Sequence, residues 1–117
     1  MLNQNFIDTI NIFPREKEVL GYKCIYKDYA IYKNGNIIEK KLELMNHSPI
    51  GLSWGYNGSG SSQTALAVLC DFTQDNEFSL KYYMEFKNEI VCKLPEKDCV
   101  LKYSEIQHWV DLQRLKK

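Results

Sequence analysis

The stretch that decides the fold reads HSPIGLSWGYNGSGSSQTALAVLCDF and covers residues 47–72. Its first half interleaves glycines and serines with Trp54 and Tyr56, which is typical of a loop. From Ala65 to Phe72 the apolar residues recur at helical spacing, and they are too numerous for a helix that lies at the surface. We therefore expect a glycine-rich loop at 47–63 that leads into the central, most buried helix.

The residues before this loop predict β-strands. Residues 19–46 are rich in tyrosine and isoleucine, and Asn34-Gly35 is a strong hairpin signal. Between residues 36 and 45, apolar side chains alternate with charged ones, which predicts a half-buried strand with one apolar face: Ile38, Leu42 and Leu44. With a weaker turn at Lys27-Asp28, the segment predicts a three-stranded antiparallel meander.

Two further helices are expected after the central one. Asp75 or Asn76 can cap the first, whose apolar residues repeat every four positions as far as Leu94. The other is expected to begin at Ser104, which forms a capping box with Gln107. Strands followed by helices predict an α+β fold, a small antiparallel sheet of about three strands covered on one face by about three helices.

The length of 117 residues suits a single domain, 1–117. We divide it into an N-terminal extension (1–18), the meander (19–46), the glycine-rich loop (47–63) and the helices (64–115). Within the extension, the spacing of Phe6, Ile10 and Phe13 predicts a short amphipathic helix.

The composition argues against several classes of protein. Basic and acidic residues number 15 each, so no overall positive field favours non-specific nucleic acid binding or a membrane surface. No apolar run is long enough to cross a bilayer and the N-terminus lacks signal-peptide features, so a cytoplasmic location is expected. The chain has four cysteines, Cys24, Cys70, Cys92 and Cys99, and they form no CxxC pair. We expect these cysteines to be reduced, and we expect neither a metal site nor a cofactor.

Residues 47–69, HSPIGLSWGYNGSGSSQTALAVL, resemble the signature of the domain-of-unknown-function family 6166, together with the later segments YMEFKNEIVCKLP (83–95) and SEIQHW (104–109). The likeness covers roughly residues 22–112. The chain departs from the family pattern at Ser61-Ser62, where relatives carry Pro-Ala, and in the added residues 1–18. The resemblance implies no activity. It implies a small cytoplasmic protein of the kind found in phages, plasmids and their bacterial hosts, and hence an anti-defence or mobile-element role.

The loop is the candidate binding site. It lacks the Gly-Lys-Ser/Thr ending of a P-loop and the last glycine of G-x-G-x-x-G, but a glycine-serine loop before a helix presents backbone N–H groups to an anion. Flanking aromatic side chains can stack on a base or a sugar. The candidate ligand-binding residues are His47, Trp54, Tyr56, Asn57, Gly58, Ser59, Gly60, Ser61, Ser62 and Gln63. The alternative is that the loop only turns the chain tightly and lets Trp54 and Tyr56 pack.

The catalytic interpretations are weaker. Gly51-Leu52-Ser53-Trp54-Gly55 matches the nucleophile elbow G-x-S-x-G in letters, but the parallel strand and the immediate helix that the elbow needs are not predicted. A His47–Ser59 or His47–Ser61 pair lacks an identifiable third group. The carboxylates at Glu77, Glu85 and Glu89 are expected on a solvated helix face. We assign no catalytic residue.

The loop thus predicts a non-enzymatic binding protein that sequesters a small anionic, nucleotide-type ligand, and the family resemblance implies that it belongs to a phage or mobile element. An inhibitor that binds a host defence protein, such as a CRISPR effector, is the alternative. Because a domain of this size has few deep clefts, we expect a homo-oligomer, most simply a dimer.

Overall fold

A computed structural model describes residues 20–116 of the protein. The expected α+β fold is confirmed, with four strands in place of about three. The sheet is antiparallel in the order β3-β2-β1-β4, with strands β1 (Gly21–Ile25), β2 (Ala30–Lys33), β3 (Asn36–Ile37) and β4 (Cys99–Lys102). The helices are α2 (Ser59–Thr73), α3 (Asn76–Glu89) and α4 (Tyr103–Arg114), with short 3-10 turns η1 (Tyr26–Asp28) and η2 (Val91–Lys93). The helix predicted at Phe6–Phe13 lies outside the described residues.

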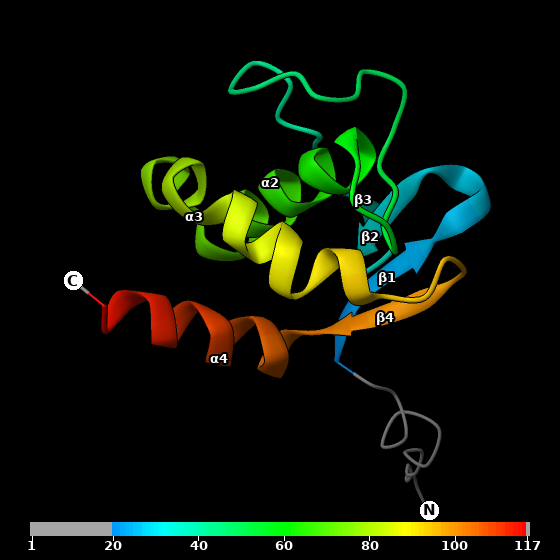
Figure 1. Ribbon diagram of the computed structural model, residues 1–117. Coiled ribbons are helices and arrows are strands. Elements are labelled where there is room, and N and C mark those ends of the chain that lie inside the picture. The colour runs from blue at the N-terminus through cyan, green and yellow to red at the C-terminus, as the bar shows by residue number, and fades with distance from the viewer. Residues whose placement is uncertain (1–19, 117) are drawn as a thin grey trace, which may run out of the picture.

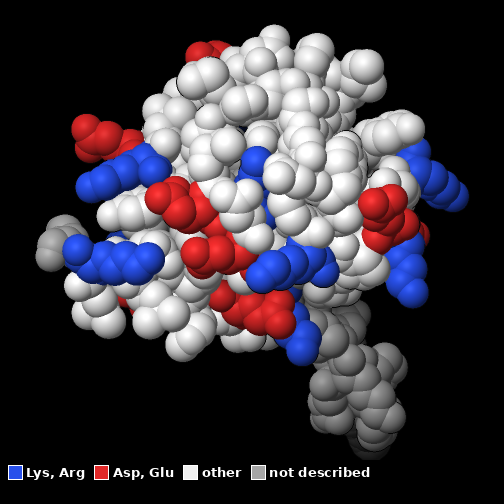
Figure 2. Space-filling view, in the orientation of Figure 1, with Lys and Arg blue, Asp and Glu red and all other residues white. Residues whose placement is uncertain are grey.

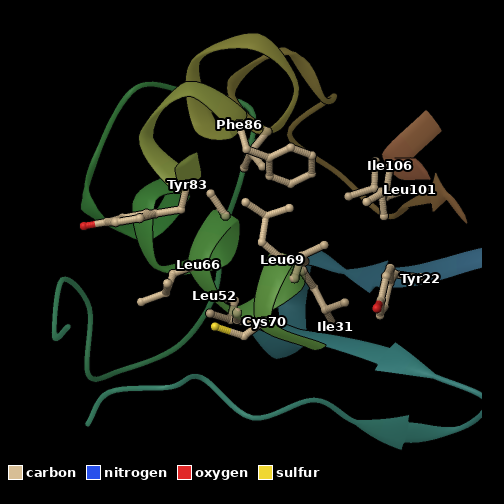
Figure 3. Packing of buried hydrophobic residues seen from close by; sticks show 14 of the residues in the cluster. Tyr22, Ile31, Leu52, Leu66, Leu69, Cys70, Tyr83, Phe86, Leu101 and Ile106 are labelled. Atoms are coloured by element: carbon tan, nitrogen blue, oxygen red, sulfur yellow. The ribbon is translucent and has the colours of Figure 1, made fainter. Parts of the chain in front are cut away.

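Helix α2 is the centre of the fold, as its sequence predicts (Figure 1). Every residue from 60 to 70 is buried, because core side chains of the sheet pack against one side of the helix and α3 packs on another. Figure 3 shows Leu69 of α2 between Phe86 of α3 and two side chains of the sheet, Tyr22 and Ile31. Burial on both sides explains why the helix is apolar nearly all round rather than along one stripe.

Two expectations about the strands are wrong. The strand expected at 36–45 ends at Ile37, although the Ile38 N–H still donates to the Ile31 carbonyl at 3.0 Å. Lys41 has φ +64°, which is incompatible with an extended strand, so the chain leaves the sheet there. The second difference is strand β4, which the sequence did not predict. It pairs with β1 and makes β1 a central strand.

The helix ends differ from expectation in two places. α3 ends at Glu89 and not near Leu94, because the chain turns into η2. α4 begins at Tyr103 with Lys102 as N-cap and no side-chain cap, so the capping box expected at Ser104 is not formed. The cap of α3 is confirmed: the Phe78 N–H donates to Asp75 Oδ1 at 3.0 Å.

We therefore expect Asp75→Ala to lower the free energy of unfolding by about 1 kcal/mol, because it removes a side-chain N-cap. Ser104→Ala should change it by less than about 0.5 kcal/mol, because Ser104 is exposed and caps nothing. Urea unfolding followed by circular dichroism measures both. Equal losses in the two variants would contradict this assignment of the helix caps.

Candidate functional site

The loop that joins β3 to α2 is fastened to the core by the side chain of Gln63. This amide is fully buried in the second turn of α2. Its Oε1 accepts from the N–H groups of His47 (2.6 Å) and Ser48 (3.0 Å), and its Nε2 donates to the carbonyls of Lys40 (2.7 Å) and Met45 (3.1 Å). All four partners are main-chain groups between residues 40 and 48, in the connection from β3 to α2. Gln63 therefore determines the path of the chain and has no hydrogen-bonding capacity left for a ligand.

Trp54 is a core residue and not a stacking platform. Its ring is fully buried, its Nε1–H donates to the Lys97 carbonyl at 3.0 Å, and Tyr26 packs edge-on against it with ring centroids 5.2 Å apart. Gly55 follows with φ +88°, and a Cβ there would lie 2.8 Å from the Leu94 carbonyl oxygen. The chain thus needs glycine here to pass close to the turn after η2.

The N-terminus of α2 is covered by Tyr56. A Cβ on Gly58 would lie 2.6 Å from the ring of Tyr56, and one on Gly60 would lie 2.7 Å from its hydroxyl, so the ring lies along this first turn. The Tyr56 hydroxyl is 2.6 Å from Ser53 Oγ, and the Ser61 hydroxyl donates to the Tyr56 carbonyl. Ser62 bonds back to the Gly58 carbonyl through its N–H and its hydroxyl, at 3.0 and 3.3 Å. No side chain of the described residues caps the helix, and the Ser59 side chain is exposed.

The remaining candidates also contact the protein itself. His47 is half-buried, with Nε2 2.8 Å from the Tyr83 hydroxyl, so it is not paired with Ser59 or Ser61. Asn57 is exposed, and its Oδ1 accepts from the ammonium of the buried Lys87 at 2.9 Å. The structure thus brings the ten predicted residues together around one loop, with most of their polar groups paired internally.

The hollows of the surface lie elsewhere. One of about 440 Å³ lies between the β2–β3 hairpin and the end of α2, where Lys33 Nζ lies 3.6 Å from Asp71 Oδ2. Another of about 580 Å³ lies beside β1 and β2, next to Lys23, Tyr32 and Tyr103. No residue of the glycine-rich loop (47–63) lines either of them. Among the described residues there is also no cluster of three or more His, Cys, Asp or Glu side chains that could hold a metal.

The loop instead contributes to an exposed aromatic and apolar surface that the sequence did not predict. We call it the tyrosine surface: Tyr26, Tyr29, Ile50 and Tyr56. Ile50 is 84 % exposed, Tyr29 56 % and Tyr56 40 %. The neighbouring Gly51 lies against Tyr29, and the Leu52 N–H donates to the Tyr29 carbonyl at 2.9 Å. Partial burial raises the pKa of Tyr26, and the charges of Glu96, Tyr56 and Tyr29 raise it further.

The backbone holds Tyr29 in an unfavourable conformation. Its φ is +51°, in the left-handed region that asparagine and glycine adopt more easily than an aromatic residue. The side chain that this strained position carries is more than half exposed, so burial of the ring does not offset the strain. Strain at an exposed aromatic residue is typical of a functional position. The richness in tyrosine at 22–32 is the signal in the sequence, but the same pattern predicts strands and does not distinguish buried from exposed rings.

The part of the chain that the structure describes contains no helix that combines the length and the apolar character needed to cross a membrane. Neither the curated proteins nor the solved structures give a match to the chain. A family model does match residues 20–112, most of the chain and nearly all of the described residues. The protein therefore belongs to the family of unknown function DUF6166.

Proposed function

We propose that the protein is a non-enzymatic binding protein, encoded by a phage or other mobile element, that contacts another protein through the tyrosine surface. Its partner would be a host defence protein, which it inhibits. The observation that carries the proposal is the cluster of exposed Tyr29, Ile50 and Tyr56 next to Tyr26. Tyrosine is enriched where proteins bind one another, because its rigid ring buries a large area and its hydroxyl still forms hydrogen bonds.

The charge distribution supports a protein partner over an anion. Between Glu43 and Asp71 the sequence contains no Lys, Arg, Asp or Glu. Figure 2 shows the result on one face: the upper part, where the β3–α2 connection runs in Figure 1, is almost free of charge, whereas charged side chains gather across the middle and the lower part. The cores of protein interfaces are depleted of charged residues. Anion sites, in contrast, usually gain affinity from Arg or Lys, and the loop itself carries neither.

Tyr29→Asn tests the proposal without loss of the fold. Asparagine tolerates a positive φ, so stability should stay equal or rise by up to about 1 kcal/mol, while partner binding should fall at least about tenfold, as for an interface hot spot. The experiment compares the proteins captured from a host-cell extract by wild type, by Tyr29→Asn with Ile50→Ser, and by the control Leu115→Ser. The control removes a similarly exposed apolar side chain just after the end of α4. The same captured proteins at the same yields from all three would refute the proposal.

A small anionic ligand at the loop is the second candidate. It is favoured by one observation: the first turn of α2 has no side-chain cap among the described residues, and uncapped backbone N–H groups can donate hydrogen bonds to an anion. The ligand would have to displace the ring of Tyr56, which covers this turn. Calorimetry with cyclic and linear nucleotides tests this candidate, and no heat from folded protein would refute it. The expected dimer is part of either proposal, and light scattering that returns the 13.8 kDa monomer would contradict it.

A further inference from the structure

Two cysteines stand opposite each other at the end of the sheet. Cys24 of β1 is the direct partner of Cys99 of β4 in the antiparallel ladder. The Tyr103 N–H donates to the Leu20 carbonyl at 3.0 Å, and this pair is four residues away from Cys24 and Cys99 on both strands. Because every second pair of a ladder is hydrogen-bonded, Cys24 and Cys99 also form such a pair, with Cα atoms about 5.5 Å apart. That Cα separation is within the range of disulfides, and the two Cβ atoms of a hydrogen-bonded pair have to move closer together for the S–S bond to form.

The two thiols differ in access. Cys24 is fully buried, with its Sγ 3.8 Å from the Tyr22 carbonyl oxygen, whereas Cys99 is partly exposed. Burial raises the pKa of both thiols, and Cys99 next to it raises that of Cys24 further, so the two sulfurs influence each other. A high thiol pKa makes attack slow at neutral pH. The pair therefore suits a slow, sustained response to an oxidant and not a rapid one.

We propose that Cys24 and Cys99 form a disulfide when the protein meets a peroxide, and that this bond stabilises the tyrosine surface. Hydrogen peroxide transfers one oxygen to the accessible Cys99 sulfur, which becomes a sulfenic acid as a water molecule is released. The Cys24 sulfur then attacks the Cys99 sulfur, the S–S bond forms, and the sulfenic oxygen leaves as a second water. Two thiols are oxidised and one peroxide is reduced.

The position of the pair connects it to the tyrosine surface, so this regulatory part rests on the proposed function. Cys24 lies two residues before Tyr26, and Asp98, directly before Cys99, accepts from the Tyr26 N–H at 2.8 Å. The carbonyl of Lys97 in turn holds the indole of Trp54, on which Tyr26 packs. A covalent link between the two strands would hold Tyr26 and the turn before β4 in the geometry described. Such preorganisation raises affinity because less conformational freedom is lost on binding.

The experiment uses the full chain treated with hydrogen peroxide, then denatured, alkylated and mapped by mass spectrometry without reduction. We expect Cys24 and Cys99 to be protected and joined in one peptide pair, and Cys70 and Cys92 to be alkylated. The thermal midpoint of the oxidised protein should rise by roughly 5–15 °C, and reductant should reverse the change. The double variant Cys70→Ser/Cys92→Ser should form the same link and show the same rise above its own reduced thermal midpoint, whereas Cys99→Ser should show neither effect.

Four alkylated cysteines after oxidation, or a link between other cysteines, would overturn the disulfide. Disulfide formation needs no partner, so this outcome is separate from failure of the tyrosine surface in the capture experiment. Two results would overturn the regulatory part of the proposal. One is a disulfide that forms without changing the thermal midpoint. The other is a disulfide that forms without changing the captured yield of a partner whose binding Tyr29→Asn abolishes.

Discussion

Replacement of Gln63 by alanine is expected to lower the free energy of unfolding by about 3–5 kcal/mol, the largest effect of any polar substitution proposed for this chain. The variant leaves two N–H groups, of His47 and Ser48, and two carbonyls, of Lys40 and Met45, without their partner. Each buried unpaired group costs about 1–3 kcal/mol, reduced where water can enter. The lost side-chain volume adds a cavity beside a fully buried position.

Chemical denaturation measures this loss, and two variants control for its cause. Gln63→Glu keeps the volume and both acceptor bonds but cannot donate to the carbonyls of Lys40 and Met45, so it should also destabilise the protein strongly. Gln107→Ala removes an exposed amide that only bonds Asp111 on the same helix, and should cost less than about 0.5 kcal/mol. A loss below about 1 kcal/mol for Gln63→Ala would mean that Gln63 does not fix the loop.

The local features of this fold were predictable from sequence because neighbouring residues encode them. Residues 65–70 are apolar nearly all round, which identifies a helix packed on more than one side. Asn34-Gly35 forms the hairpin with positive φ at both positions, 53° and 83°, and Asp75 caps α3. In each case one short segment carries the whole signal.

The rest depends on contacts between distant segments. The alternation at 36–45 is that of a strand, yet Gln63, about twenty residues later, draws the carbonyls of Lys40 and Met45 away from the sheet. β4 has only four residues, and its pairing with β1 spans most of the chain. Within the loop, Trp54 and Tyr56 are two residues apart, and only the path around Gly55 puts one inside and the other at the surface. Spacing alone does not distinguish a buried aromatic residue from an exposed one.

Gly60→Val is expected to lower the free energy of unfolding by about 3 kcal/mol, because the first turn of α2 has no room for a side chain. A Cβ at Gly60 would lie 2.1 Å from Ser53 Oγ and 2.7 Å from the Tyr56 hydroxyl, so both groups must move and their mutual hydrogen bond is lost. A loop that served only as a ligand site would lose binding with little change in stability. Thermal and urea unfolding distinguish the two roles.

A double-mutant cycle makes the steric cause specific. Gly60→Ala alone should cost about 1–2 kcal/mol, although alanine is the better helix former by about 1 kcal/mol. In the background Ser53→Ala the nearest clashing atom is absent and only the Tyr56 hydroxyl still has to move, so the same change should cost less, with a coupling of at least about 1 kcal/mol. Additive effects of the two substitutions would contradict the clash with Ser53.

Ser61→Pro is the matched control in the same turn. Ser61 is the third residue of α2, where the N–H has no acceptor within the helix, so proline removes no helical hydrogen bond there. The preceding residue is Gly60, which has no Cβ to clash with the proline ring. The loss is limited to the bond from the Ser61 hydroxyl to the Tyr56 carbonyl, about 1 kcal/mol. Stability that falls far more with Gly60→Val than with Ser61→Pro would show that close packing against Tyr56, and not loop flexibility, determines the sequence at this turn.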